Sequence, residues 1–403
     1  MDLTAAPSMP LAAITAREGF AALAEALGGD KGETRLVGGI VRDTLLGHAA
    51  SDVDLATLHA PAETMARLAR AGIRAVPTGI AHGTVTAVLP GGPVEVTTLR
   101  RDVSTDGRHA VVAYSDDWQE DAARRDFTIN ALYADTHGGA VSDFFGGLAD
   151  LSRRRVRFIG DPLQRIAEDH LRILRFFRFH ARFGDTIDAA GLDACTARAN
   201  DLMALSRERI AAELLKLLVA REAVPVIALM VTRGIWLAVL PEIDAAGAER
   251  LAALAIREAA AGVAPDPVRR LAALVAPAAA EDVGARLKLS NGQRRRLAAA
   301  TVGIGDEGPQ ALAYRAGVEG AIDRLLLDGA DPRTIAAWTP PRLPIGGGEL
   351  VARGLRKGPA VAAALKTVET RWIAEGFPPA DRVAAIADAV VAQALGEAGA
   401  IIA

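Results

Sequence analysis

Two aspartates separated by one residue, Asp52 and Asp54, are the side chains of this sequence best placed to do chemistry together. They stand in the segment SDVDLAT, which predicts a short strand, and residues i and i+2 of a strand point to the same face. Two neighbouring carboxylates repel each other unless a cation lies between them. Mg²⁺ suits that position, because it accepts one or two carboxylates together with substrate phosphates. Glu95, in PVEVTTLR, is a plausible third ligand, and two metals there could activate an attacking hydroxyl and stabilise a leaving pyrophosphate.

A glycine pair precedes the two aspartates. Gly38 and Gly39 follow a short apolar run and open a predicted short helix, so backbone N–H groups there could approach a triphosphate closely. Arg42, about one turn further on, could reach a phosphate or the ribose. Alone, a Gly-Gly pair is usually a plain turn and an Asp-x-Asp pair is usually solvated. The combination GG-x-x-R-D followed by D-x-D is much rarer, and the chain has no G-x-x-x-x-G-K-[ST] phosphate loop.

A second candidate region, residues 165–183, has the spacing of one helix with an apolar back and a polar stripe. Asp169 and Arg172 are three residues apart on that stripe. The carboxylate could accept from the exocyclic amino group of cytosine or adenine, while the guanidinium donates to the ring atom beside it. Arg175 and Arg178 would then be left for phosphates or RNA. The alternative is a solvated helix with an Asp–Arg surface salt bridge.

These residues are positioned by a predicted α+β head followed by an all-helical remainder. Apolar runs at 84–89 and 94–98 predict strands joined by a hairpin at Gly91-Gly92-Pro93, and residues 13–28 predict a helix. Residues 138–150 are predicted to form a loop that closes the head. We predict a nucleotide-handling head with a small mixed β-sheet over residues 1–150, a helical neck over 151–220, a helical body over 221–335 and a helical tail over 336–403.

Composition favours a cytoplasmic protein with a nucleic-acid partner. The 403 residues are 51% hydrophobic and 24% charged, and the single cysteine, Cys195, excludes a disulfide framework. No leader sequence and no apolar stretch long enough to cross a membrane is expected. Net charge is only −3, but residues 151–183 hold nine arginines and three acids, which predicts a basic patch.

The ordered motifs resemble those of the class II tRNA nucleotidyltransferase and poly(A) polymerase family, of the polymerase-β type. The segments that carry the resemblance are LVGGIVRDTLLG…SDVDLAT, RRDFTINALY (124–133), IAEDHLRILRFFRF and RERIAAELLKLL (207–218), with looser similarity through KLSNGQRRRL and PIGGGELVARGLRKGPAVAAAL. The resemblance implies metal binding by Asp52 and Asp54 and nucleotide contacts by Gly39, Arg42 and Arg125. It also implies base reading by Asp169 and Arg172, with Arg175 and Arg178 as further nucleotide-site arginines.

The second motif, RRDFTINALY, also has an interpretation of its own. Phe127, Ile129, Ala131 and Leu132 are apolar enough to be core, Arg125 could face the triphosphate, and Asn130 could satisfy buried backbone groups. The implied partners are tRNA, with CTP and ATP as substrates and Mg²⁺ as cofactor. No membrane and no obligatory protein partner is expected. Residues 101–114 fall where the family has a mobile loop, with a plain surface hairpin as the alternative.

Addition of CCA to the 3′ end of tRNA is the activity that the resemblance favours. A poly(A) polymerase shares every motif, but such enzymes are usually longer and carry strongly basic extensions. Enzymes that add only CC or only A remain open, as does a non-catalytic RNA-binding adaptor on the same fold, against which the intact Asp52 and Asp54 argue. An attached phosphohydrolase is discounted, because the chain has no His-Asp dipeptide and only seven histidines.

Overall fold

The computed structural model describes residues 8–49, 52–105 and 110–400. It divides into two compact units, each described by itself. The first comprises Met1–Ala248 with Arg286–Lys288, and the second comprises Glu249–Ala285 with Leu289–Ala403. No helix in the described ranges combines the length and the apolarity that a bilayer crossing requires.

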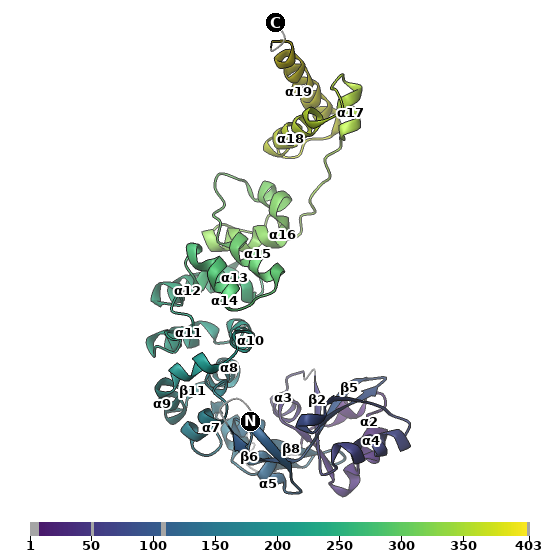
Figure 1. Cartoon of the computed structure of the whole chain (residues 1–403), viewed down its shortest axis with the longest axis vertical. Helices are drawn as coiled ribbons and strands as arrows, with labels where there is room; N and C mark the ends of the chain where they lie inside the picture. Colours follow the sequence, from purple (N-terminus) through teal and green to yellow (C-terminus); the bar gives the residue numbers. More distant parts are fainter. Residues whose placement is uncertain (1–7, 50–51, 106–109, 401–403) are drawn as a thin grey trace. The chain divides into compact units, whose positions relative to one another are not determined.

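A seven-stranded mixed sheet forms the core of the first unit (Figure 1). Strands β2 and β5 run parallel, and every other neighbouring pair is antiparallel. In spatial order the strands are β3 (Arg74–Gly79), β4 (Thr84–Leu89), β5 (Gly92–Thr98), β2 (Val53–Thr57), β1 (Thr34–Val37), β8 (Leu132–Asp135) and β9 (Val141–Asp143). The predicted small mixed sheet is therefore confirmed, and so is the β4–β5 hairpin.

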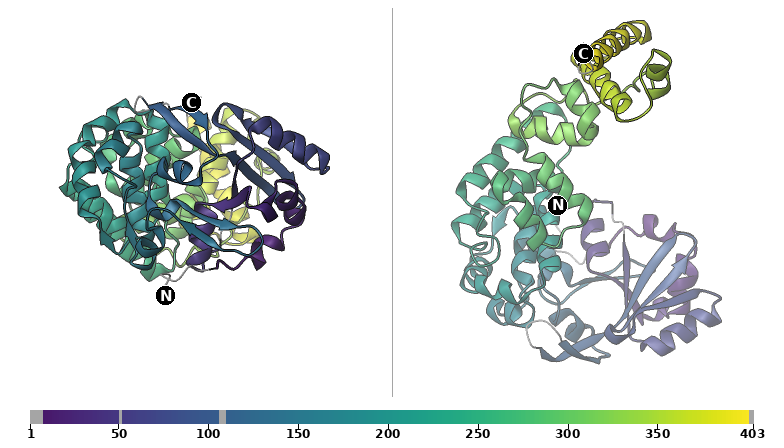
Figure 2. Two further views of the ribbon diagram at one scale, coloured as in Figure 1. Left: turned by 90° about the horizontal axis from the view of Figure 1, so that it is seen from below. Right: turned by 45° about the horizontal axis from the view of Figure 1, so that its top comes forward.

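Helices α2 (Phe20–Ala26) and α4 (Pro61–Arg70) pack on one face of this sheet, as Figure 2 shows. That face carries the fully buried side chains of the alternating strands, such as Val85, Val94 and Val96. The opposite face carries Asp54 and Glu95 and is more exposed. Period-two alternation therefore separates a packed face from a face that is open to substrates.

Three predicted segments differ from expectation at a glycine or a turn. The helix predicted over residues 13–28 is two helices, α1 (Ala12–Thr15) and α2, because Gly19 between them has a φ of 87°. The loop predicted over 138–150 contains the edge strand β9 and the start of α6 (Gly147–Ser152). Residues 101–114 lie almost wholly in a hairpin of β6 (Arg100–Thr105) and β7 (Ala110–Tyr114), and residues 106–109 lie outside the described residues.

Helices dominate the remainder of the first unit. Helix α8 packs against α10 and α11, and α7 packs against α9. The helices are α3 (Gly39–Leu45), α5 (Trp118–Ala123), α7 (Pro162–Glu168), α8 (Arg172–Phe183), α9 (Ala189–Ala197), α10 (Arg207–Leu218) and α11 (Ala223–Thr232). Short 3₁₀ turns cover Gly29–Lys31, Ile80–His82, Thr128–Asn130 and Ala199–Ala204, and β10 (Arg155–Val156) pairs in parallel with β11 (Thr186–Ile187).

The second unit is helical throughout its described residues. Its helices are α12 (Ala245–Ala261, which begins in the first unit), α13 (Pro267–Leu274), α14 (Ala280–Arg286), α15 (Asn291–Ala300), α16 (Pro309–Asp328), α17 (Gly347–Ala352), α18 (Pro359–Ala374) and α19 (Ala380–Ala400), with a 3₁₀ turn at Pro277–Ala279. A buried ion network joins four of them: Arg269 contacts Glu258 and Asp323 at 2.8 Å each, and Arg296 reaches Asp323 at 2.7 Å. The part after residue 151, predicted to be all helical, is confirmed as largely helical, with the short pair β10 and β11 as an exception.

Candidate active site

Two carboxylates meet where β2 and β5 pair, and a third lies just before β2. Asp54 and Glu95 are direct partners in the parallel register, so their side chains leave the same face of adjacent strands. Asp52 is exposed and precedes β2, which begins at Val53, one residue later than the predicted strand. Burial raises the pKa of Asp54 to about 6, with the charges of Glu95 and Asp52 adding to the rise and that of Arg125 opposing it. The negative charge at this point is therefore poorly compensated by the protein.

That uncompensated charge is what a divalent cation would relieve, and the donor set fits one. Within the described ranges, no three histidine, cysteine or acidic side chains lie close enough to cage a metal on their own. Mg²⁺ does not need such a cage, since it is held by one or two carboxylates together with waters and substrate phosphates. The site therefore fits a metal that arrives with a phosphorylated substrate.

The glycine turn lies beside one arginine. Gly38 has φ 72° and ψ −118°, a conformation that only glycine adopts readily. A Cβ at Gly38 would lie 3.4 Å from Nη1 of Arg125, so the turn and the guanidinium are in contact distance. Arg125 is also close enough to Asp54 to lower the pKa of that carboxyl. The structure thus brings together Gly38, Arg125 and Asp54.

Arg125 is held in place by two partners from neighbouring elements. It donates from Nε to the Tyr133 hydroxyl at 3.2 Å and from Nη2 to Asp121 at 3.1 Å. Tyr133 in turn donates to Asp121 at 2.7 Å. Burial alone would raise the pKa of Asp121, but Arg125 and Arg124 outweigh it and bring the pKa to about 2. Asp121 is thus a permanent anion that orients Arg125, and the i,i+4 spacing of the two residues was the signal in the sequence for it.

Arg42 has a different environment from the one its motif suggests. Its side chain is buried, donates to Asp43 at 2.7 Å and to the Asn130 side chain, and lies 4.2 Å from the ring centroid of Phe183. Burial lowers its pKa, with Asp43 acting against that effect. A Cβ at Gly39 would still lie 3.7 Å from Nη2 of Arg42, so one edge of the guanidinium faces the glycine turn. The buried Arg42 side chain therefore packs beside the glycine turn.

The single helix predicted over residues 165–183 is wrong. Helix α7 ends at Glu168 and α8 begins at Arg172, and Asp169 between them is extended, with φ −149° and ψ 107°. Asp169 accepts from Nη2 of Arg209 on α10, at 3.0 and 3.1 Å, and from the backbone N–H of Leu171 at 3.1 Å. The helical stripe that joined Asp169 to Arg172 does not exist, because the chain turns between them.

The Arg172 side chain pairs with the carboxylate of Glu168 rather than with that of Asp169. It donates to the Glu168 carboxylate at 2.6 Å and to the backbone carbonyls of Arg165 and Arg124 at 2.9 and 3.0 Å. The i,i+4 spacing of Glu168 and Arg172 was visible in the sequence, but the apolar periodicity concealed the break. Both Asp169 and Arg172 remain half-buried at this turn.

Arg175 and Arg178 are occupied by buried carboxylates. Arg175 binds Asp126 at 2.6 Å, and Arg178 binds Glu213 of α10 at 2.5 Å. Burial alone would raise the pKa of Asp126, but Arg175 and the hydrogen bond from Asn130 bring it to about 2. These arginines therefore join α8 to α10 and to the segment between α5 and the 3₁₀ turn at Thr128–Asn130, a role that their spacing did not reveal.

The basic patch predicted over residues 151–183 is largely neutralised by acids from outside that window. The pairs are Arg154 with Asp185, Arg155 and Arg157 with Asp150, Arg175 with Asp126, Arg178 with Glu213, and Arg182 with Asp43. A count of charges in one stretch of sequence omits partners that the fold supplies. The predicted excess is therefore much smaller on the folded surface.

The second motif is core, as predicted, with one difference. Phe127, Ile129, Ala131 and Leu132 are all fully buried. Asn130 was expected to satisfy backbone groups, but its side chain instead donates to Asp126 at 2.9 Å and accepts from Arg42. Asn130 thus connects the helix after the glycine turn to the ion pair of Asp126 and Arg175.

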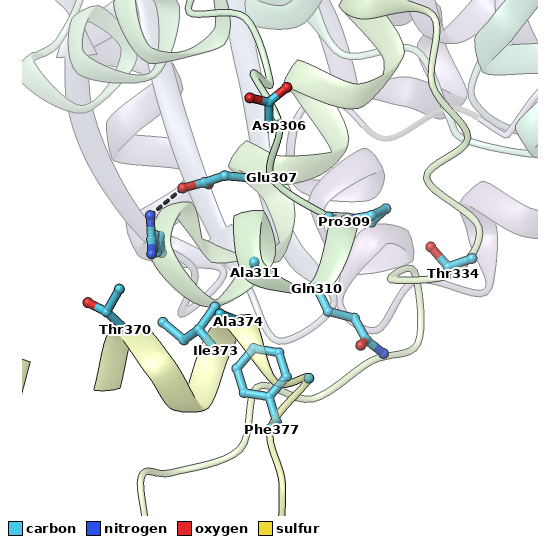
Figure 3. A pocket seen from close by; sticks show the side chains of 13 residues that line it. Asp306, Glu307, Pro309, Gln310, Ala311, Thr334, Thr370, Ile373, Ala374 and Phe377 are labelled. Atoms are coloured by element: carbon cyan, nitrogen blue, oxygen red, sulfur yellow. Dashed lines mark hydrogen bonds and ion pairs between the residues drawn. The ribbon is translucent and has the colours of Figure 1, made fainter. Parts of the chain in front are cut away.

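A pocket of about 690 Å³ lies in the second unit, far along the chain from these residues (Figure 3). Phe377, Ile373 and Gln310 are among its lining residues, and Glu307 on its rim is paired with Arg315. None of the predicted site residues lines it. The carboxylates and the glycine turn, which follows the end of β1, lie in the first unit.

Two family models match parts of the chain. Residues 34–157 match the poly A polymerase head domain, and residues 186–246 match the probable RNA and SrmB- binding site of polymerase A. The mouse protein named CCA tRNA nucleotidyltransferase 1, mitochondrial, is 46% identical over 205 residues, which are 50% of this chain and 47% of that protein. The CCA-adding enzyme of Levilactobacillus brevis is 42% identical over 206 residues, 51% of each chain. The matched stretch thus spans about half the length of these relatives.

Solved structures match over more of the chain. The Bacillus stearothermophilus CCA-adding enzyme in complex with CTP has a TM-score of 0.67 and 28% identity, and the match covers 88% of this chain and 93% of that one. The Thermotoga maritima CCA-adding enzyme complexed with tRNA has a TM-score of 0.66 at 19% identity, covering 93% and 94%. The α+β head followed by helices is the fold that these structures share with this chain.

Proposed function

We propose that this chain, which belongs to the class II family of CCA-adding tRNA nucleotidyltransferases and poly(A) polymerases, adds C, C and A to the 3′ end of tRNA from CTP and ATP. The names of the mouse and Levilactobacillus relatives support the activity. The solved relative that carries CTP, at 28% identity, supports the nucleotide class. tRNA is proposed as the partner on the same grounds.

One observation carries the proposal: Asp54 and Glu95 are paired across β2 and β5 with Asp52 beside them, and the pKa of Asp54 is raised to about 6. Carboxylates that repel each other in this way suit nucleotidyl transfer. In that reaction the attacking hydroxyl oxygen forms a bond to phosphorus while the bond from phosphorus to the leaving oxygen breaks. When bound, Mg²⁺ would favour ionisation of the attacking 3′-hydroxyl and offset the charge of the departing pyrophosphate. Asp52 and Asp54 are proposed to hold it, with Glu95 as the third carboxylate.

The neighbouring residues are proposed to bind and orient the nucleotide. Gly38 leaves open space beside Arg125, whose guanidinium is held by Asp121 and Tyr133, so a triphosphate would meet a fixed positive charge there. Gly39 and Arg42 are proposed to shape that turn. Because the reacting phosphorus would lie between this charge and the carboxylates, the arrangement orients the triphosphate with its leaving group towards Arg125.

Selection of C and A is proposed to rest on Asp169 and Arg172. Both are half-buried at the turn between α7 and α8, and both hold protein partners in the structure, Arg209 and Glu168 respectively. Base reading would therefore use the lone pairs and N–H groups that these contacts leave open. Arg175 and Arg178 support this turn through Asp126 and Glu213, which keeps them in the nucleotide site as positioning residues.

The proposal is tested by incubating end-labelled tRNA that lacks CCA with Mg²⁺ and each set of nucleotides, and by reading the products on a sequencing gel. Growth by three residues with CTP and ATP, then a halt, is the expected result. A long ladder with ATP alone would identify a poly(A) polymerase instead. A stop after two C residues, or a requirement for an existing CC end, would identify a partial activity.

A purified chain that adds nothing, with an Asp52→Ala, Asp54→Ala variant that binds tRNA equally well, would identify a non-catalytic RNA-binding adaptor.

The cytoplasm remains the proposed compartment. The single cysteine, Cys195, is free and buried, and burial holds the pKa of its thiol well above the usual range. The division into head, neck, body and tail at residues 150, 220 and 335 also remains a proposal.

A further inference from the structure

A row of threonine hydroxyls continues the carboxylate face of the sheet on the side away from the glycine turn. In the strand register Asp54 is opposite Glu95, and Glu95 is opposite Thr86. Thr97 lies two residues after Glu95 on the same face, opposite Thr84. Since neighbouring strands are about 4.8 Å apart, Thr86 lies about 10 Å from Asp54 across the sheet.

These hydroxyls are accessible and have hydrogen-bonding capacity left. Thr84, Thr86 and Thr97 are half-buried and Thr78 is exposed. They form two pairs, Thr84 with Thr97 at 3.1 Å and Thr78 with Thr86 at 2.8 Å. A hydroxyl has one donor and two acceptor positions, so each pair keeps one O–H group and several lone pairs for another molecule.

The two sides of the carboxylates differ in charge and in access. On one side lie Arg125 and the glycine turn, which suit a triphosphate. Across β1, the same face is covered by Trp118 of α5, whose ring centroid lies 4.2 Å from the Arg35 guanidinium. On the threonine side, neither β4 nor β5 carries a lysine or an arginine, and the threonine side chains are only half-buried or exposed. A hydroxyl-rich surface without basic residues, next to the Glu95 carboxylate, suits sugar hydroxyls better than it suits a phosphate chain.

We propose that this threonine face, Thr78, Thr84, Thr86 and Thr97, seats the 3′-terminal ribose of the acceptor RNA and recognises its 2′-hydroxyl. The inference rests on the proposed function, because it requires that an RNA 3′ end react at Asp54. The reacting 3′-hydroxyl must reach the carboxylates, and the nucleotide that bears it must therefore lie on an adjoining surface. Of the adjoining surfaces, the charged one is assigned to the triphosphate and the β1 side is covered. A 2′-hydroxyl is what distinguishes RNA from DNA at such a seat.

The test compares Thr86→Val and Thr97→Val, singly and together, with Thr232→Val, an exposed threonine at the end of α11, as the matched control. The acceptor is a tRNA minihelix ending in CC, with either ribose or 2′-deoxyribose in its last two nucleotides. The loss of one neutral hydrogen bond changes an equilibrium about threefold to tenfold. We expect each site variant to raise KM for the ribose acceptor by about that factor and to leave KM for ATP unchanged.

The decisive readout is the ribose preference itself. The wild type and Thr232→Val should prefer the ribose acceptor, and the double variant should treat both acceptors alike. A general loss of folding would lower activity on both acceptors equally and would not remove the preference. An unchanged preference in the double variant, or a rise in KM for ATP instead of the acceptor, would overturn the proposal. If the wild type extends neither acceptor, the proposed function fails first, and binding of the two minihelices by fluorescence anisotropy still decides whether this face reads the 2′-hydroxyl.

Discussion

Replacement of Asp54 by asparagine should stabilise the metal-free protein. The pKa of the Asp54 carboxyl is raised from 3.8 to about 6, mainly by burial and then by Glu95. A shift of that size corresponds to about 3 kcal/mol, since one unit is 1.36 kcal/mol. Because the group is only partly buried and solvent screens it, about 1–2 kcal/mol is the expected gain. For a unit of this size that corresponds to a rise of roughly 2–8 °C in Tm.

The pH dependence of this gain has a definite sign. The folded protein holds the Asp54 proton to a higher pH than the unfolded chain, so the wild type is penalised only once the pH rises above about 4. The penalty grows up to about pH 6 and is constant above it. The difference in Tm between Asp54→Asn and the wild type should therefore be full at pH 7.5 and about half as large at pH 5.

The assay is thermal unfolding in EDTA and in Mg²⁺, with Asp116→Asn, an exposed aspartate, as the matched control. A cation that binds only the folded state adds RT ln(1 + [L]/Kd) to stability. The wild type and Asp116→Asn should gain stability from Mg²⁺, whereas Asp54→Asn should gain much less. An Asp54→Asn protein that is less stable than the wild type in EDTA, or that responds equally to Mg²⁺, would refute the electrostatic reasoning.

Three further predictions concern the turn, the base and the ion pairs. Gly38→Ala should destabilise by about 1–3 kcal/mol in urea unfolding, and by more than Gly32→Ala, because Gly32 has an ordinary left-handed conformation with open space around it; equal costs would contradict this. Asp169→Ala with Arg172→Ala should loosen the choice among the four nucleotides in single-nucleotide incorporation, with the Mg²⁺ dependence unchanged; an intact C and A preference would place base reading elsewhere. Glu213→Gln should cost about 1–3 kcal/mol, because it leaves the half-buried Arg178 without a charged partner; calorimetry that shows no loss of stability would exclude that role.

The sheet and the carboxylates were predictable because their signals are local. Alternation with period two identified β4 and β5. The Asp-x-Asp spacing predicted a strand carrying two carboxylates, and β2 carries Asp54, with Asp52 just before it. Glu95 was named as a third carboxylate from its strand alone. Its pairing with Asp54 depends on strand order, which the sequence does not state.

What could not be predicted depends on contacts between distant residues. The turn at Asp169 is stabilised by Arg209, 40 positions later, and the apolar periodicity on either side of the break fits one helix equally well. The predicted basic patch over residues 151–183 is smaller than expected for the same reason, since the acidic partners Asp126 and Glu213 lie outside that stretch. Asn130 was assigned to backbone groups because its partner Arg42 is separated from it by 88 positions.

The parallel pairing of β2 and β5 has a consequence for how the protein folds. Asp54 and Glu95, 41 positions apart, become neighbours only when β2 pairs with β5, and β3 and β4 lie between these two strands in the sequence. Contacts of such separation form late, because the chain between them must be ordered first. A nascent or partly folded chain would therefore not yet hold Asp54 and Glu95 side by side. A cation bound by these carboxylates, as proposed, would therefore slow the unfolding of the completed sheet without speeding its formation.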